Sequence, residues 1–594
     1  AIWLLSSHPR FSMKLFVLLP SVVCALFARS SDEEIKNYDH LRESVVRIQA
    51  VNSYFDWMVP YTLKYDSVGV GSGFVVQTDP YPLFVTNAHV VTDAKQVTLQ
   101  LLLFGEQEWD ADVVAICQKF DLALLVLRDP SKFNHALRQQ NISLASLHIS
   151  EKVVTMGEDV LALGFPLGQN TLKISKGNIA GNEEVDENLC IQSTAPISPG
   201  NSGGPLLNAE ATSVVGVNFA KATSGENINF VIPAWRVSQI IRKHLKDQPD
   251  YHEGMEWKRV QVNVPKPQLV TVESNDALFS MSNTCHQGIY ISKVRESSLF
   301  RQASPPVEEN SFLVSVNGHE VDRFGRGVNP DFAADRVKFP DLVFMVPSLA
   351  SNVTFTTCSQ SKGLVEHGVS LDYDESTRER GLRWVDEPYW ENTHKKFEYF
   401  GGVVVMEMTV NHVSVVVNDY YDPGPSRWLH PSLIDQPRLM VTYVDPGSYA
   451  SNVIREGAAV SSVNGHKVST LDEYREHFVP VDSNVWFLET DMSQVLTAMF
   501  NETLQLQVGK AVSAPHLFTR AVEMASMRFN SSASTAPRQL RGVPSDKRKT
   551  LLGIKQDKPR AQRPAELKIR AAGPVLASKQ GRVRTTRGKA IMDV

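Results

Sequence analysis

The sequence lacks the motifs of metal sites and nucleotide sites. Its 594 residues contain no Cys-x-x-Cys and no His-Glu-x-x-His, so we expect no metal ion. No Gly-Lys-Ser/Thr run follows the glycine-rich stretch 69–73, which leads into a predicted strand and therefore indicates a turn rather than a phosphate cradle. We expect no cofactor, and no unfolding power drawn from ATP.

Long apolar runs are also scarce, and the exception lies near the start. Met13-Lys14 precedes the apolar run Leu15 to Phe27 and the small residues that follow it, so 13–30 has the features of a secretory signal peptide. The run is too short for a good membrane-spanning helix, and no span is expected in the mature chain. The signal predicts the secretory pathway or the exterior. A plastid, a mitochondrion, an N-terminal anchor and a buried helix stay open as alternatives.

Cysteine is rare, with five residues in all. Cys24 lies in the predicted signal, and the other four form no dense disulfide framework. Cys285 and Cys358 fall in one predicted module, where they either pair in an oxidising compartment or stay as buried thiols. The remaining two are Cys117 and Cys190.

The charge is uneven along the chain. The net charge of −5 hides a basic tail at 535–594, where 16 Lys or Arg stand against 4 Asp or Glu. The Pro, Gly and charge content of this tail predicts a disordered, solvated extension. Binding of nucleic acid or anionic lipid by the tail is the weaker alternative, so no specific nucleic acid is expected as a partner.

The chain is too long for one core, and its length suggests three or four units. Short β-branched runs alternate with Gly, Asn, Asp and Pro between Val45 and Val231, which predicts a β-rich domain. Apolar residues at helical spacing then predict a helix over Trp235 to Leu245.

A serine loop, Pro199-Gly200-Asn201-Ser202-Gly203-Gly204, lies near the end of this β-rich domain. A serine hydroxyl becomes a nucleophile when a base and an orienting carboxylate accompany it. His89 and Asp121 supply these in the order His, Asp, Ser, each beside a β-rich apolar segment. Taken singly, they would indicate a core histidine and a turn cap. Together they predict a catalytic triad of His89, Asp121 and Ser202, with an oxyanion hole at Gly200, Asn201 and Ser202.

At these residues the chain resembles the HtrA/DegP family of serine endopeptidases. Further matches are the runs 71–76, 163–168, 197–199 and 229–233. The resemblance implies a mainly β fold, in which a chymotrypsin-like double β-barrel protease domain at 40–245 holds the triad between two six-stranded barrels.

Two hairpin sequences repeat downstream. Val316-Asn317-Gly318-His319 recurs as Val463-Asn464-Gly465-His466, and Asn-Gly between strands predicts a hairpin. Each follows a strand and precedes a helix and a strand, which resembles the circularly permuted PDZ module and the layout of plant-type Deg proteases. Two unrelated hairpins are the alternative. We assign a first PDZ-like domain to 260–375, and linker strands with a second, divergent one to 376–510. The segment 397–403 is expected to pack between the modules.

The family resemblance implies an ATP-independent endopeptidase that cleaves unfolded or damaged proteins in protein quality control. Pro196 stands six residues before Ser202, where trypsin-like enzymes carry an acidic pocket base, so cleavage after Lys or Arg is not expected. With Ile197, Ile228 and Phe230 as pocket residues, the resemblance implies small aliphatic P1 residues. It also implies a homotrimer or larger oligomer through Tyr54, Phe55 and Trp57, unless these pack locally. A non-proteolytic chaperone or PDZ peptide-binding scaffold is the alternative function.

Overall fold

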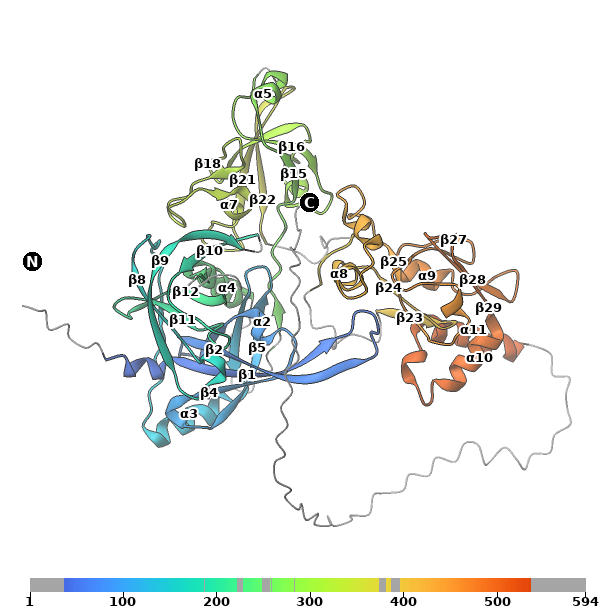
Figure 1. Cartoon of the computed structure of the whole chain (residues 1–594), viewed down its shortest axis with the longest axis horizontal. Coiled ribbons are helices and arrows are strands. Elements are labelled where there is room, and N and C mark those ends of the chain that lie inside the picture. Colours follow the sequence, from blue (N-terminus) through green and yellow to red (C-terminus); the bar gives the residue numbers. More distant parts are fainter. Residues whose placement is uncertain are drawn as a thin grey trace, which may run out of the picture. The chain divides into compact units, whose positions relative to one another are not determined.

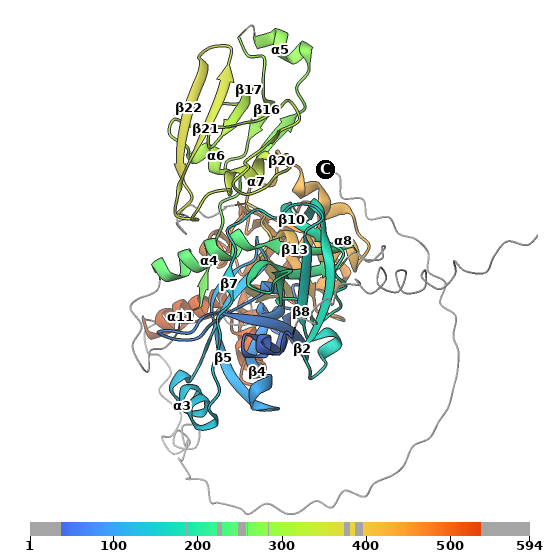
Figure 2. The same ribbon diagram turned by 90° about the vertical axis from the view of Figure 1, so that its left-hand side faces the viewer.

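The structure is a computed structural model, and it describes residues 37–185, 187–221, 228–247, 257, 259–282, 284–372, 381–385 and 396–535. The predicted signal peptide and the tail from residue 536 lie outside these ranges. The described residues up to 530 form one compact unit, shown in two views in Figures 1 and 2. Within the described ranges, no helix is long and apolar enough to cross a membrane.

The first barrel is built from six antiparallel strands in the order β4-β1-β2-β3-β6-β5, and pairing of β5 with β4 closes it. The short strand β14 adds to β5 outside the closed barrel. The strands are β1 (Val45–Phe55), β2 (Leu63–Gln77), β3 (Leu83–Thr86), β4 (Ala94–Leu101), β5 (Glu108–Cys117), β6 (Leu122–Leu127) and β14 (Val260–Gln261).

The second barrel closes in the same way, with β11 pairing both β8 and β12. Its strands are β8 (Asp159–Gly164), β9 (Lys173–Val185), β10 (Asn188–Ser193), β11 (Pro205–Asn208), β12 (Ser213–Lys221) and β13 (Asn229–Pro233), and β7 (His148–Ile149) adds to β12. Two closed six-stranded barrels confirm the predicted double-barrel fold.

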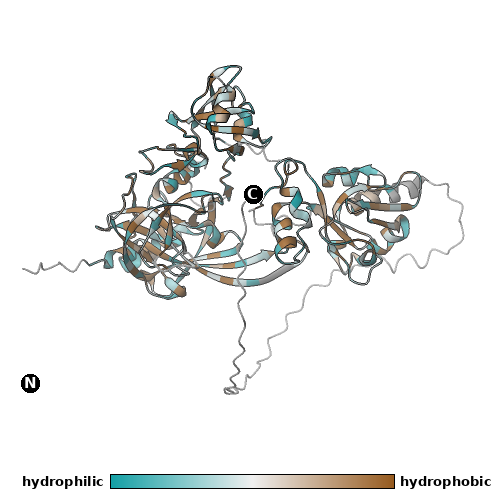
Figure 3. Cartoon of the chain, turned by 45° about the horizontal axis from the view of Figure 1, so that its top comes forward, coloured by the Kyte–Doolittle hydropathy of each residue, from teal (hydrophilic) through white to brown (hydrophobic). Residues whose placement is uncertain are grey.

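Short helices connect the barrel strands, and a longer one ends the domain. They are η1 (Asp39–Glu43), α2 (Ala88–Val91), η2 (Leu102–Phe104), α3 (Pro130–Gln140), η3 (Pro166–Gly168) and α4 (Ala234–Asp247). Helix α4 confirms the helix expected over 235–245. Strand β6 is buried along its whole length, which fits its unbroken apolar sequence, and Figure 3 shows hydrophobic residues along the barrel strands.

A six-stranded sheet forms the first module, with β15 at one edge and β22 at the other. A disulfide joins Cys285 to Cys358 on β21, with the Cα atoms 5.8 Å apart, whereas Cys117 and Cys190 are buried and form no disulfide within the described residues. The elements are β15 (Leu269–Val272), α5 (Asp276–Ser282), β16 (Ile289–Val294), α6 (Leu299–Gln302), β17 (Ser311–Val316), β18 (His319–Glu320), β19 (Arg326–Gly327), β20 (Val337–Lys338), α7 (Phe339–Val343), β21 (Asn352–Ser359) and β22 (Gly363–Ser370).

The second module has a seven-stranded sheet that begins with β23 and β24. The expectation that 397–403 packs between the modules is wrong, because this segment supplies β23 and the start of β24. The elements are β23 (Phe397–Phe400), β24 (Val403–Glu407), α8 (Val410–Asn418), η7 (Gly424–Leu429), β25 (Leu439–Val444), η8 (Ala450–Asn452), β26 (Ala459–Val463), β27 (His466–Lys467), α9 (Leu471–Glu476), β28 (Val485–Thr490), β29 (Val495–Met499), α10 (Phe500–Lys510), η9 (Pro515–Leu517) and α11 (Arg520–Thr535).

The repeated Asn-Gly pairs have the same structure in both modules. Asn317 and Asn464 adopt φ of 50° and 49°, and each is followed by a glycine with positive φ, as a tight hairpin requires. The Asn317 side chain donates to the carbonyl oxygen of Leu342 at 3.1 Å, and that of Asn464 donates to Phe478 at 3.0 Å. The asparagine therefore ties the hairpin to the following helix α7 in the first module, and to the chain just beyond α9 in the second.

The hairpin formed by β1 and β2 reaches the second module. Met58 is 2% exposed in a cluster with apolar residues of α8 and β25, and Trp57 packs edge-on against His412 at 5.2 Å between ring centroids. Phe55 also packs against second-module residues, while Tyr54 is 46% exposed. These aromatic residues lie at the end of the long β1–β2 hairpin.

Candidate active site

Pairing of β3 with β6 brings His89 and Asp121 together. Thr86, the last residue of β3, lies opposite Ala123 near the start of β6, so the residues that follow β3 face those that precede β6. Asp121 Oδ2 lies 2.7 Å from His89 Nδ1, and Asp121 Oδ1 accepts the His89 backbone N–H at 2.8 Å. Asp121 has a left-handed φ of 50°, a conformation that Asp adopts more readily than most residues.

The carboxylate controls the protonation of the imidazole. Burial lowers the pKa of His89, but the hydrogen bond and the negative charge of Asp121 outweigh burial and raise this pKa above its ordinary value of 6.5. With Nδ1 facing the carboxylate, Nε2 is the nitrogen left to exchange a proton with a reacting group.

Ser202 lies in the loop between β10 and β11, at the contact between the barrels. Its backbone carbonyl oxygen accepts the Ser72 N–H at 2.8 Å, which fixes the loop against β2 of the first barrel. The Ser202 hydroxyl donates to the carbonyl oxygen of Phe219 at 3.3 Å. Within the described residues it makes no hydrogen bond to His89, so the hydroxyl is directed at β12.

A tight turn positions the loop amides. The Asn201 N–H donates to Ser198 at 2.9 Å, with Pro199 second in the turn and Gly200 third at a φ of +99°, which are the features of a type II turn. The Pro199 carbonyl accepts the Leu167 N–H at 2.6 Å. Because a trans peptide points its C=O and N–H in opposite directions, the Gly200 N–H faces away from Leu167.

Two amides of this loop remain available. Among the described residues, neither Gly200 N–H nor Ser202 N–H donates to a protein acceptor. The Asn201 N–H, the third donor that the sequence suggested, is used inside the turn. A side chain on Gly200 would place its Cβ 2.4 Å from the Phe165 carbonyl oxygen, so only glycine fits there. The loop thus presents two N–H groups beside the serine hydroxyl.

Ser72 is a site residue that the sequence motif contained but did not assign. It is fully buried, and its hydroxyl donates to the Gly200 carbonyl oxygen at 2.6 Å while accepting the Phe165 N–H at 3.0 Å. Through these bonds Ser72 joins β2 to the serine loop at Gly200 and to Phe165. The segment that begins at Phe165 also holds Pro199, through the Leu167 N–H. The sequence did contain a signal for this role, because Ser72 lies between Gly71 and Gly73, and glycines allow two backbone segments to approach closely.

A cavity of about 370 Å³ opens beside His89 and Asp121. None of the four predicted pocket residues lines this cavity: Ile197 is buried in the second barrel core, Pro196 is exposed, and Ile228 and Phe230 are half-buried. The residues that line the cavity are His89, Gln118, Lys119, Phe120, Asp121, Val185, Asn188, Leu189, Cys190, Phe219, Ile232 and Arg236.

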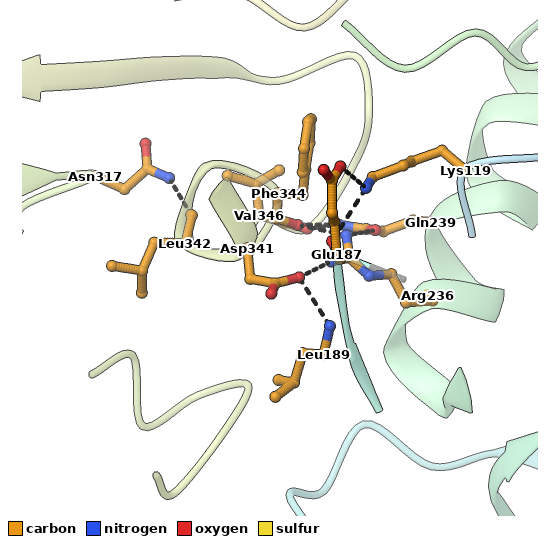
Figure 4. Close-up of polar contacts among 10 residues, drawn as sticks. All are labelled: Lys119, Glu187, Leu189, Arg236, Gln239, Asn317, Asp341, Leu342, Phe344 and Val346. Carbon is orange, nitrogen blue, oxygen red and sulfur yellow. Dashed lines mark hydrogen bonds and ion pairs between the residues drawn. The ribbon is translucent and has the colours of Figure 1, made fainter. Parts of the chain in front are cut away.

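Arg236, which lines this cavity, is held by a residue of the first module. The Arg236 guanidinium lies 3.9 Å from the centre of the Phe120 ring, next to Asp121, and pairs with Asp341 of α7 at 3.1 Å (Figure 4). Both side chains are almost fully buried, and Asp341 also accepts the Leu189 N–H at 3.1 Å. Burial lowers the pKa of Arg236 to about 10, with Asp341 opposing the shift, so the guanidinium is charged near neutral pH; burial also raises the pKa of Asp341, and Arg236 opposes that shift.

No metal site accompanies this arrangement in the part of the chain that the structure describes, where no three His, Cys, Asp or Glu residues gather within reach of one ion. The serine, the imidazole and the two amides are the chemically useful groups, and they suit acyl transfer.

Comparison with known proteins agrees with this geometry. The family profile described as trypsin-like peptidase domain matches residues 71–217. Mouse serine protease HTRA4 is 29% identical over 261 residues, which cover 42% of this chain and 50% of that protein. The putative mitochondrial protease Do-like 3 of Arabidopsis thaliana is 26% identical over 313 residues, which cover 51% and 50%.

The chain spans about half the length of these curated relatives. Among solved structures, the serine endoprotease from Yersinia pestis is 20% identical, with coverage of 56% of this chain and 95% of that one and a TM-score of 0.34. The family profile and the curated relatives confirm the resemblance to HtrA/DegP serine proteases that the motifs predicted.

Proposed function

We propose that the protein is a serine endopeptidase that cleaves peptide bonds by acyl transfer, without ATP or a cofactor. The observation that carries the proposal is the His89–Asp121 pair beside a serine loop with two unpaired amides. His89 takes the Ser202 proton as Oγ attacks the substrate carbonyl, and it then protonates the leaving amine. Asp121 holds the imidazole and stabilises its charged form. Water finally releases the acyl group from Ser202.

In this mechanism the amides of Gly200 and Ser202 bind the tetrahedral oxyanion. The turn at 198–201 holds the Gly200 amide in place before substrate arrives, so little reorganisation is needed there. The serine does need to move, because its hydroxyl must rotate from the Phe219 carbonyl oxygen toward His89 Nε2. The resting protein thus has two loop amides without a protein acceptor among the described residues, and a serine hydroxyl that donates to Phe219.

Unfolded or damaged proteins are the proposed substrates, with small aliphatic P1 residues and a role in protein quality control. The absence of an acidic residue at Pro196 and the resemblance to HtrA/DegP proteases support this choice. A homotrimer or larger oligomer and delivery through the signal peptide to the secretory pathway, or to an organelle, complete the proposal. Phe55 and Trp57 contact the second module, so Tyr54 is the predicted aromatic left exposed for a subunit contact.

The test is degradation of a reduced and alkylated protein without ATP, by wild type and by Ser202→Ala. Wild type should produce fragments and the variant none, while both bind the unfolded chain. Equal fragmentation by the two proteins would contradict the assignment.

A non-proteolytic chaperone or peptide-binding scaffold is the second candidate. It is favoured by the first module, where β15 is an edge strand in the described sheet and can accept an added strand, as PDZ-like modules do. Under this function Ser202→Ala would prevent aggregation of an unfolded protein as well as wild type does, and wild type would release no fragments.

A further inference from the structure

The two modules share one strand order, and the second adds a strand. The first sheet runs β15-β16-β17-β21-β22, and the second runs β24-β25-β26-β28-β29 with β23 outside β24. The Asn-Gly hairpins place β17 and β26 in equivalent positions. Strand β24 is therefore the counterpart of β15, and β23 occupies the edge that β15 leaves unpaired in the described sheet.

Strand β23 lies antiparallel to β24 and beside α9. Glu398 is opposite Val405 in the sheet, and its carboxylate accepts a hydrogen bond from Arg475 of α9 at 2.6 Å. Phe400 packs edge-on against Phe478, just beyond the same helix, at 4.9 Å between ring centroids. Four consecutive residues thus fill the space along α9 where an added strand would lie.

Strand β23 is buried in the second module as a bound peptide would be. The Glu398 side chain is 1% exposed, and its second oxygen accepts the Ala521 N–H at 3.0 Å. Gln507 of α10 donates to the Tyr399 carbonyl oxygen at 2.6 Å. The carboxylate has two donors, which is what makes burial of its charge tolerable. Helices α10 and α11 therefore cover β23 from the side opposite β24.

The C-terminal end of β23 is not a free chain end, because the chain continues from it into β24. Phe400 continues through Gly401 and Gly402, both with positive φ, directly into β24. A bound chain end would place its free carboxylate at this position, and here a two-residue turn stands instead. An external chain would have to displace β23 while it remains tethered, which keeps its effective concentration high.

We propose that the strand-binding groove of the second module holds residues 397–400 as its own permanent ligand and takes no external chain. The occupied groove then serves a different partner, the β1–β2 hairpin of the same chain. Tyr61 packs against Phe397 at 5.9 Å between ring centroids, on the face of β23 directed away from α9. The second module is thus a support for the protease domain, and strand capture is left to the first module.

The test uses hydrogen exchange of the full-length chain in a Ser202→Ala background, so its outcome does not depend on cleavage. The probe is the peptide Lys-Phe-Glu-Tyr-Phe, which has the sequence of residues 396–400. Added to the protein, it should leave exchange in β24 and α9 unchanged. Slowed exchange in those two elements would overturn the proposal.

Glu398→Lys should release β23 from the groove, because it places a lysine beside the Arg475 guanidinium. Exchange at 397–407 should rise at least about tenfold, since breaking a buried pair is strongly destabilising, and the peptide should slow it again. Asp472→Asn is the matched control, because Asp472 also pairs with Arg475 but its side chain is 93% exposed. If Glu398→Lys unfolds the whole module, Glu398→Gln replaces it. Unchanged exchange at 397–400 in the opened variant, or no response to the peptide, contradicts the proposal.

Discussion

The Ser72 hydroxyl of the first barrel donates a hydrogen bond to the Gly200 carbonyl oxygen of the nucleophile loop, 128 residues away, at 2.6 Å. This bond and the Leu167–Pro199 bond fix the two peptides that flank Gly200. The orientation of the Gly200 amide, which we propose as an oxyanion donor, therefore depends on the contact between the barrels, and a single buried hydroxyl mediates it.

Ser72→Ala should lower kcat by roughly 10- to 100-fold with a small change in KM, because about 1–3 kcal/mol is lost when two buried backbone groups lose their partner. Steady-state cleavage of a fluorogenic peptide measures both constants. Ser462→Ala is the control, since it removes a similar hydroxyl bond, to Glu489, in the second module. Equal kcat for wild type and Ser72→Ala would show that the hydroxyl does not hold the oxyanion site.

The activity should depend on pH through His89. Its pKa is raised in the folded protein, and only the neutral imidazole accepts the serine proton, so kcat/KM should rise with pH through an inflection above 6.5. The pair's contribution to stability has the opposite sign: it is fully present below 6.5 and is lost as pH rises through the folded pKa.

Asp121→Asn tests the origin of this shift. The inflection should move to lower pH, and kcat should fall by as much as about 10⁴-fold, because the neutral amide neither charges nor orients the imidazole. An inflection that stays in place would mean that another group sets the pKa of His89.

Asp341→Asn should destabilise the protein by about 3–5 kcal/mol, since it leaves the Arg236 guanidinium buried without its counter-charge. Urea unfolding measures the loss. A double variant, Arg236→Met with Asp341→Leu, should recover most of the stability because neither charge remains buried.

Asp372→Asn is the matched control for this interface. Asp372 pairs with Lys243 and Lys246 of the same helix α4, but its side chain is 45% exposed, so its loss should cost no more than about 1 kcal/mol. Equal costs for Asp341 and Asp372 would show that the buried pair contributes no more than a surface pair.

Reduction should weaken the first module selectively. The Cys285–Cys358 bond closes a loop of 73 residues, and its loss in Cys285→Ser should cost about 2–4 kcal/mol. Peptide mapping without reductant should recover the linked pair, with Cys117 and Cys190 alkylated only after unfolding. Recovery of four free thiols at these positions would contradict the pairing.

Local chemistry made much of this structure predictable. The order of His89, Asp121 and Ser202, the turn demanded by Pro199-Gly200, and both Asn-Gly hairpins follow from short motifs. Arg236 and Asp341 could not be paired from sequence, because they lie 105 residues apart and each resembles an ordinary surface charge. Strand β23 was misplaced since an apolar run does not reveal which sheet edge it joins. The role of Ile197 in a substrate pocket stays a prediction.

The most direct measurement is intact-protein mass spectrometry after reaction with an organophosphonate that traps activated serines. We expect one adduct, mapped to Ser202, which is absent in Ser202→Ala and forms much more slowly in His89→Ala. An adduct at another serine, or labelling of His89→Ala as fast as wild type, would contradict the claim that His89 activates Ser202 beside a formed oxyanion site.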